Sequence, residues 1–313
     1  MTNKKSKKYI VGIGAANVDI YAKSNIRIRE HYDHPSIIKT TPGGVTRNIL
    51  ENASKLGVNT KLLTAVGDDT YGEVVLNSCI NSNIDIKNVI KVKGARTGVF
   101  MQVQNNNNDM HLALCDMSIS KNIDIKYINS KDKLIKKATA IVLDPSLDLE
   151  VIEYILDRYT NVPIFVDPIS DLYAKKIKPY LNRIYCIKPN KTELGVLSGI
   201  KIKNKNDLYK AYEKVNSYTD NLFVSCGKHG CMYSNENNEI IMRKLKPVKN
   251  MANASGAGDA FMSALLYSYV NDLNIEKTVD LALAGGIAAI IDEHTINPNL
   301  SVKLLRKILK EYK

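Results

Sequence analysis

Short apolar segments alternate with amphipathic helical patterns along most of this chain, and this alternation limits the possible folds more than any other feature. Residues 9–14, 140–143 and 163–166 read as buried strands, while residues 47–56 and 151–159 place their apolar side chains on one helical face. Strands separated by helices of this length are typical of a mostly parallel sheet. We therefore predict a doubly wound α/β fold with helices on both faces of the sheet.

The same periodicity predicts further elements in both halves of the sequence. Strands are expected at residues 61–66, 183–187 and 222–225, and helices at residues 71–83 and 207–218.

Two segments depart from this rhythm. Residues 16–22 alternate apolar and polar side chains like a half-exposed strand, and residues 97–114 read as two strands joined across a polar tip at 105–109. Extra strands on a doubly wound core suggest a small β lid, formed at about residues 16–40 and 96–117. Because no linker or repeat divides the chain, all 313 residues are expected to form one domain with this lid.

The formal net charge of +12 raises nucleic-acid binding as an alternative function. The Lys residues, however, lie in short scattered clusters, and no known nucleic-acid-binding motif accompanies them. We therefore expect a solvated basic surface that helps to attract an anionic cosubstrate. No apolar run is long enough to span a membrane, and an odd number of cysteines, five, fits a reducing compartment. A cytoplasmic protein without nucleic-acid or membrane partners is the prediction.

The most informative motif is Ser255-Gly256-Ala257-Gly258-Asp259, which directly precedes a predicted apolar helix. Glycines before a helix allow backbone N–H groups to converge, and a helix N-terminus favours negative charge. An Asp at this position could accept the proton of a hydroxyl that attacks a phosphoryl group. The alternative is a Gly-rich turn in which the Asp is an ordinary helix cap.

This segment resembles the signature of the ribokinase and phosphofructokinase-B carbohydrate kinases. The resemblance implies that Asp259 is the catalytic base and that Gly256, Ala257 and Gly258 form the anion hole. Ser255, which stands where the family often has Thr, keeps a hydroxyl beside the expected ATP site. ATP and Mg²⁺ are the implied cosubstrate and cofactor.

Three more segments resemble motifs of the same family, in the expected order. Pro42-Gly43-Gly44-Val-Thr46-Arg-Asn48 resembles the Gly-Gly motif of the sugar site. Asn190-Lys-Thr-Glu193 resembles the Asn-x-x-Glu motif, which implies that Asn190 and Glu193 organise Mg²⁺, through water, and that Asn190 also contacts ATP. Ser225-Cys-Gly227-Lys-His-Gly230 resembles a nucleotide-side turn, which implies ATP contacts for Ser225, Gly227 and Gly230.

The expected substrate side begins after the first strand, where Asn17 and Asp19 lie two residues apart and therefore on one face of a strand. A carboxylate can accept hydrogen bonds from two neighbouring hydroxyls, which suits the diol of a ribose. The family resemblance implies that both residues hold the sugar, together with Gly43, Gly44 and Asn48. For each residue alone, a turn or a helix cap is the alternative.

Within the family, residues 41–48, 111–119 and 293–301 look like the bacterial pseudouridine kinases. Those kinases usually carry a small residue where this chain has Thr46, so a positive φ at that position would strain this sequence. Asp116 would then reach the ribose or the base, unless it is an ordinary carboxylate of a surface hairpin. The sequence leaves open other acceptors (uridine, inosine, adenosine, ribose and fructose), activation by a monovalent cation such as K⁺, and a homodimer formed through the lid.

Other function classes fit the sequence less well. Gly12-Ile-Gly14 is one Gly short of a dinucleotide-binding fingerprint, and the pattern after it is strand-like instead of helical. A P-loop motif does not occur in the sequence. The main alternative to an enzyme is a protein of the same fold that senses a nucleotide or a sugar without catalysis, which the intact Asp259 disfavours.

Overall fold

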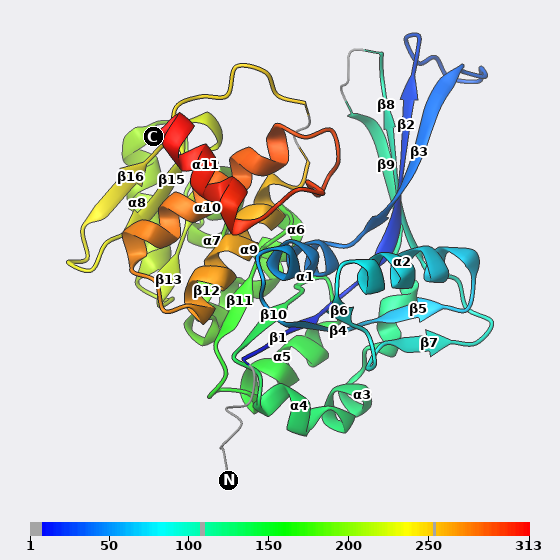
Figure 1. Cartoon of the computed structure of the whole chain (residues 1–313), viewed down its shortest axis with the longest axis horizontal. Helices are drawn as coiled ribbons and strands as arrows, with labels where there is room; N and C mark the ends of the chain where they lie inside the picture. The colour runs from blue at the N-terminus through cyan, green and yellow to red at the C-terminus, as the bar shows by residue number, and fades with distance from the viewer. Residues whose placement is uncertain (1–7, 107–109, 253–254) are drawn as a thin grey trace.

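The structure is a computed structural model that describes residues 8–106, 110–252 and 255–313 (Figure 1). Part of the predicted polar tip at residues 105–109 lies outside the described residues.

A central sheet of seven parallel strands forms the body of the molecule, in the order β13-β12-β11-β10-β1-β4-β6. Its strands are β1 (Ile10–Ile13), β4 (Thr60–Leu63), β6 (Ile84–Asp85), β10 (Ala140–Leu143), β11 (Ile164–Val166), β12 (Cys186–Ile187) and β13 (Asn221–Leu222). The predicted doubly wound, mostly parallel sheet is confirmed.

Helices cover both faces of this sheet (Figure 1). One face packs against α1 (Val45–Lys55), α2 (Thr70–Asn81), α9 (Ala257–Val270), α10 (Ile275–Ile290) and α11 (Val302–Tyr312). The other packs against α3 (Ile125–Ser130), α4 (Asp132–Lys136), α5 (Leu149–Arg158), α6 (Asp171–Ile177), α7 (Lys191–Ser198) and α8 (Lys205–Asn216).

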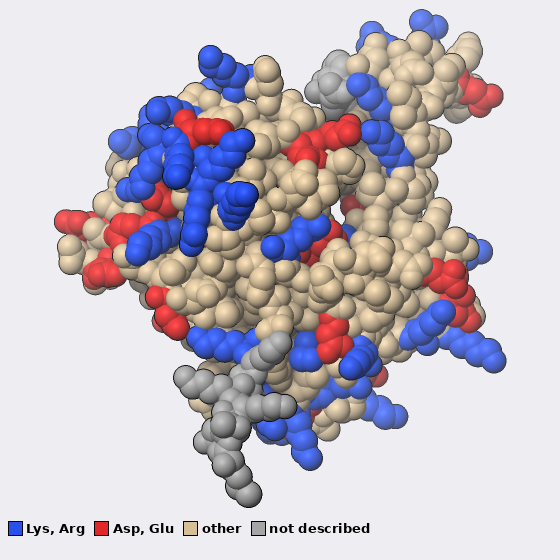
Figure 2. All heavy atoms as spheres, viewed as in Figure 1, with Lys and Arg blue, Asp and Glu red and all other residues tan. Residues whose placement is uncertain are grey.

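Successive side chains of a strand point to opposite faces of the sheet, so each central strand contributes to the apolar cores on both faces. In β1, for example, Ile10 packs with the α9 side, while Val11 and Ile13 pack with the α5 side. No helix in the described part of the chain is long and apolar enough to cross a bilayer. On the face drawn in Figure 2, Lys and Arg side chains are densest over α11, whose opposite, apolar stripe is buried.

A second sheet stands out from the body in Figure 1, and we call it the projecting sheet. It contains β3 (Ser36–Gly43), β2 (Asn17–Ser24), β8 (Gly98–Gln104) and β9 (Met110–Asp116), in that spatial order. These strands lie where the extra strands were predicted. Asn17, Asp19 and Tyr21 share one of its faces, and Val18 and Ile20 share the other.

Two segments that were each predicted as a single strand are divided into two strands that belong to different sheets. The segment 61–66 is divided between β4 and β5 (Ala65–Gly67), which pairs with β7 (Ile90–Val92). The segment 222–225 is divided between β13 and β14 (Val224–Ser225), which joins β15 (Cys231–Ser234) and β16 (Ile240–Arg243). In both segments the chain stays buried as it changes sheets, so the apolar pattern gives no sign of the change.

Candidate active site

The N-terminus of α9 opens toward the junction of the two sheets. Gly256 precedes the helix with a φ of 78°, and no described side chain caps this end through a hydrogen bond. A Cβ at Gly256 would lie 1.9 Å from the carbonyl oxygen of Thr295, so only glycine fits here. The first backbone N–H groups of a helix have no intrahelical partner and carry partial positive charge. The arrangement is suited to an anion.

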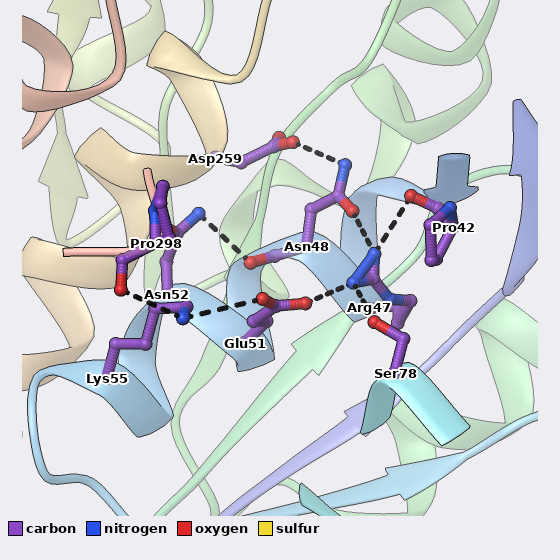
Figure 3. A network of polar contacts seen from close by, with 9 residues as sticks. All are labelled: Pro42, Arg47, Asn48, Glu51, Asn52, Lys55, Ser78, Asp259 and Pro298. Atoms are coloured by element: carbon purple, nitrogen blue, oxygen red, sulfur yellow. Dashed lines mark hydrogen bonds and ion pairs between the residues drawn. The ribbon is translucent and has the colours of Figure 1, made fainter. Parts of the chain in front are cut away.

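Asp259 lies in the first turn of α9, and its Oδ2 accepts a hydrogen bond of 3.0 Å from Nδ2 of Asn48 in α1 (Figure 3). Burial, and to a lesser extent the charge of Asp167, raise the pKa of Asp259 to about 7. The hydrogen bond from Asn48 and the charge of Lys188 oppose this rise. A carboxylate whose pKa is near neutrality is well matched to general base catalysis.

Asp167 and Lys188 directly follow β11 and β12, and their side chains form a buried ion pair of 3.0 Å. The pair lies beside the α9 terminus, because a Cβ at Gly258 would be 3.3 Å from Nζ of Lys188. Burial alone would lower the pKa of Lys188, but the charge and hydrogen bond of Asp167 raise it, so the ammonium form is favoured. The sequence analysis missed both residues. The signal that could have found them is a charged residue directly after a buried strand.

Asn190 and Glu193 form a capping box at the start of α7. Oδ1 of Asn190 accepts from the backbone N–H of Glu193 at 2.9 Å, and Oε2 of Glu193 accepts from the backbone N–H of Asn190 at 2.8 Å. The helix therefore already uses one oxygen of each residue. Burial raises the pKa of Glu193, with a further rise from the charge of Asp167. A cation nearby would stabilise this cluster of carboxylates, while the described residues offer no group of three His, Cys, Asp or Glu side chains able to ligate a metal directly.

The predicted nucleotide-side turn lies next to this capping box, since Ser225 forms a β-bridge with Asn190. Gly227 and Gly230 both have positive φ, and a Cβ at Gly230 would lie 1.9 Å from the carbonyl oxygen of Arg243. The glycines are therefore required by the tight turn between β14 and β15.

The predicted sugar residues meet at the base of the projecting sheet. Nδ2 of Asn17 donates to Oδ1 of Asp19 at 2.7 Å, and burial raises the pKa of Asp19. A Cβ at Gly43 would lie 2.2 Å from that same oxygen, so Gly43 leaves room for the Asp19 carboxylate. Gly44 has a φ of 97° and packs against the backbone of Ala15. Asp19 also contributes to the raised pKa of Asp259, which indicates that the predicted sugar residues lie near Asp259.

Thr46 is not strained, because it lies within α1, where φ is helical. Its methyl group occupies space left by Gly12: a Cβ there would lie 2.8 Å from the Thr46 Cγ2. Its hydroxyl lies 3.3 Å from the buried Asp144 carboxylate, which also accepts from the backbone N–H of Ala15. The expected conflict at this position is therefore resolved by glycine in the neighbouring strand and by a hydrogen bond.

Asp116 does not lie on the same face of the projecting sheet as the other predicted sugar residues, Asn17 and Asp19. It pairs with Val99 in the projecting sheet and therefore lies on the face of Val18, opposite to Asp19. Its side chain is exposed and accepts from the backbone N–H of Ser118, which lowers the pKa of the carboxyl. The structure favours the surface-hairpin alternative for this residue, because strand pairing fixes the face on which each side chain stands.

A hollow of about 870 Å³ lies between the projecting sheet, the start of α1 and residues 293–296. Its lining includes Tyr21, Lys39, Arg47 and Ser255. This volume falls in the range of small-molecule sites.

Comparison with known proteins places the chain among kinases. The profile of the pfkB family carbohydrate kinases matches residues 7–301. The pseudouridine kinase of Escherichia coli is 35% identical over 300 residues, which cover 95% of each chain. Among solved structures, a putative sugar kinase from Clostridium perfringens superposes with a TM-score of 0.86 at 28% identity, covering 99% of this chain and 98% of that one. Arabidopsis thaliana ribokinase, solved with ribose and ATP, superposes with a TM-score of 0.83 at 19% identity, covering 97% and 99%, and supports the fold.

Proposed function

The chain belongs to the pfkB family of carbohydrate kinases, and we propose that it transfers the γ-phosphoryl group of ATP to the 5′-hydroxyl of pseudouridine. The observation that carries this proposal is the position of Asp259: a carboxylate with a pKa near 7 at an uncapped helix N-terminus, close to the Asn17 and Asp19 pair. The similarity to the E. coli pseudouridine kinase supports the choice of acceptor.

In the proposed reaction, Asp259 accepts the proton of the acceptor hydroxyl while its oxygen forms a bond to the γ-phosphorus. The bond from this phosphorus to the β,γ-bridging oxygen breaks, and ADP leaves. The N–H groups of Gly256, Ala257 and Gly258 face the charge that spreads over the transferring group. Lys188, held by Asp167, adds a fixed positive charge beside Gly258.

ATP is proposed to lie along the carboxyl edge of the central sheet, near Ser225, Gly227, Gly230, Asn190 and Ser255. The residues fit Mg²⁺ held through water, since the Glu193 carboxylate stands in an acidic cluster and Mg²⁺ gives up its hydration reluctantly. When bound, Mg²⁺ would neutralise phosphate charge.

The ribose is proposed to lie against the base of the projecting sheet, held by Asn17, Asp19 and the second amide hydrogen of Asn48, where Gly43 and Gly44 let the backbone approach. The projecting sheet would then act as the lid, and its closure would exclude water from the transferring group. A monovalent cation such as K⁺ remains a proposal to be tested by adding salts of K⁺ and Na⁺.

A homodimer through the projecting sheet is also proposed. The face opposite to Asp19 carries exposed apolar side chains on the two edge strands of the sheet, among them Ile38 on β3 and Leu114 on β9, at 66% and 60% exposure. Apolar faces of this kind commonly pack against a partner. Sedimentation of the Ile38→Lys/Leu114→Lys variant should show a lower mass than the wild type, with Leu172→Lys on α6 as the control.

The deciding experiment measures ADP release from purified protein with ATP and Mg²⁺, with pseudouridine, uridine, inosine, adenosine, ribose and fructose offered separately. A preference for pseudouridine supports the proposal. A preference for another acceptor would retain the kinase and reject the acceptor. Release with none of them would favour the sensor, to be tested next by nucleotide binding.

A further inference from the structure

Arg47 takes no part in the reaction described above, yet its guanidinium is buried at the centre of the network in Figure 3. Nη1 donates to Oδ1 of Asn48 at 2.9 Å and to the carbonyl oxygen of Pro42 at 3.0 Å. Nη2 donates to Glu51 and, at 3.2 Å, to Oγ of Ser78. The side chain is thus held by α1, by α2 and by the end of β3.

The Arg47–Glu51 ion pair is poorly explained by stability alone. The Arg47 side chain is only 2% exposed and that of Glu51 only 11%, so both charges have lost most of their hydration. Buried ion pairs of this kind are often no more stabilising than apolar side chains of similar volume. A specific orienting task would explain why this helix carries a guanidinium here.

The contact with Asn48 provides such a task. A guanidinium can only donate hydrogen bonds, so the Asn48 atom that faces Arg47 must be the carbonyl oxygen. The amide nitrogen then points the other way, where it donates to Oδ2 of Asp259 at 3.0 Å. If Asn48 rotated by 180°, its carbonyl oxygen would face the carboxylate of Asp259 instead.

We propose that Arg47 is a positioning residue for the catalytic base: it fixes the side chain of Asn48 so that its amide donates to Asp259. This inference rests on the proposed function, in which Asp259 is the base. Because Arg47 also holds the carbonyl of Pro42, the orientation of Asn48 is tied to the base of the projecting sheet.

Loss of this orientation has a defined consequence. The hydrogen bond from Asn48 lowers the pKa of Asp259, so its loss should raise that pKa further above 7. Loss of one hydrogen bond to a charged carboxylate corresponds to a rise of its pKa by about one unit. The base would then be protonated, and inactive, over more of the neutral range.

The test is the double variant Arg47→Met/Glu51→Met, which removes both buried charges and leaves neither unpaired. The readouts are the pH dependence of kcat/KM and the titration of the Asp259 carboxyl followed by NMR of ¹³C-labelled Asp, assigned with Asp259→Asn. The matched control is Lys55→Met, because Lys55 contacts the same Glu51 carboxylate from the side away from Asn48.

In the double variant we expect the midpoint of the kcat/KM profile and the midpoint of the Asp259 NMR titration to rise by about one pH unit each. Activity should therefore be about tenfold lower than that of the wild type at pH 6 and close to it at pH 9. Lys55→Met should keep both midpoints. Midpoints unchanged in a folded double variant would overturn the inference. If the double variant does not fold, Arg47→Lys replaces it. We expect this variant to shift both midpoints in the same direction by a smaller amount. The absence of any shift would contradict the proposal. The NMR titration needs no substrate, so it tests Arg47 even if no acceptor is phosphorylated.

Discussion

The central sheet and the projecting sheet contribute to the candidate active site in different ways. The central strands are buried on both faces, and Asp167 and Lys188 follow directly where two of them end. The projecting sheet is buried at its base, while side chains farther along, such as Ile38, are exposed. In the proposed reaction, the groups beside the phosphoryl group are thus fixed by the packed body, whereas the groups proposed to hold the acceptor stand on a sheet that is exposed along much of its length. Changes in the body should therefore affect turnover, and changes in the projecting sheet should affect substrate use.

The largest effect is expected from the body. Asp259→Asn should lower kcat by about 10³-fold or more, because it removes the proton acceptor and keeps the shape of the side chain. ATP affinity should change little, since the α9 backbone is retained. Steady-state kinetics and ATP titration measure both quantities. Turnover close to that of the wild type would show that another group accepts the proton.

The projecting sheet offers a matched pair of carboxylates on opposite faces. Asp19→Ala should lower kcat/KM for the acceptor by about 100-fold, because two hydrogen bonds to a charged group are lost. Asp116→Ala should stay within about twofold of the wild type. Equal effects of the two substitutions would show that strand pairing does not predict which face meets the acceptor.

The pH dependence of activity tests the proposed role of Asp259, which lies in the body of the molecule. Asp259 must be deprotonated to act as a base, and its pKa is raised to about 7, so kcat/KM should rise with pH across this value. Between pH 6 and pH 8 the increase should be about tenfold. A flat profile over this range would mean that the base of the free enzyme does not titrate between pH 6 and pH 8, or that a step without proton transfer limits kcat/KM.

The smallest effect concerns stability. The folded state raises the pKa of Asp259 above its ordinary value of 3.8, so folding takes up a proton between these two values. Wild-type stability should therefore fall as pH rises from about 4 to 7 and level off above 7. Asp259→Asn escapes this penalty and should be more stable by roughly 2 kcal/mol at pH 8, about half the full shift because the side chain keeps some exposure. Thermal unfolding at pH 5 and pH 8 measures the difference, which should be larger at pH 8.

The sequence predicted the sheet and the residues within motifs better than it predicted what surrounds them. Asp259 and Gly256 could be singled out as candidate site residues because a helix start with glycines has a local signature. Lys188 and Asp167 were missed because each stands alone in the sequence, and only the parallel pairing of β11 and β12 brings them together. The face of Asp116 could not be predicted, since it depends on register with β8.

The pairing of β2 with β8 has a consequence for recombination between relatives. The two strands run parallel side by side, although they leave the body at widely separated points of the chain, the first after β1 and the second after β7. A chimaera that inherits β2 and β3 from one parent and β8 and β9 from another must match its cross-strand neighbours along the whole shared edge. We therefore expect a change of acceptor preference only when the β2–β3 segment and the β8–β9 segment are exchanged together.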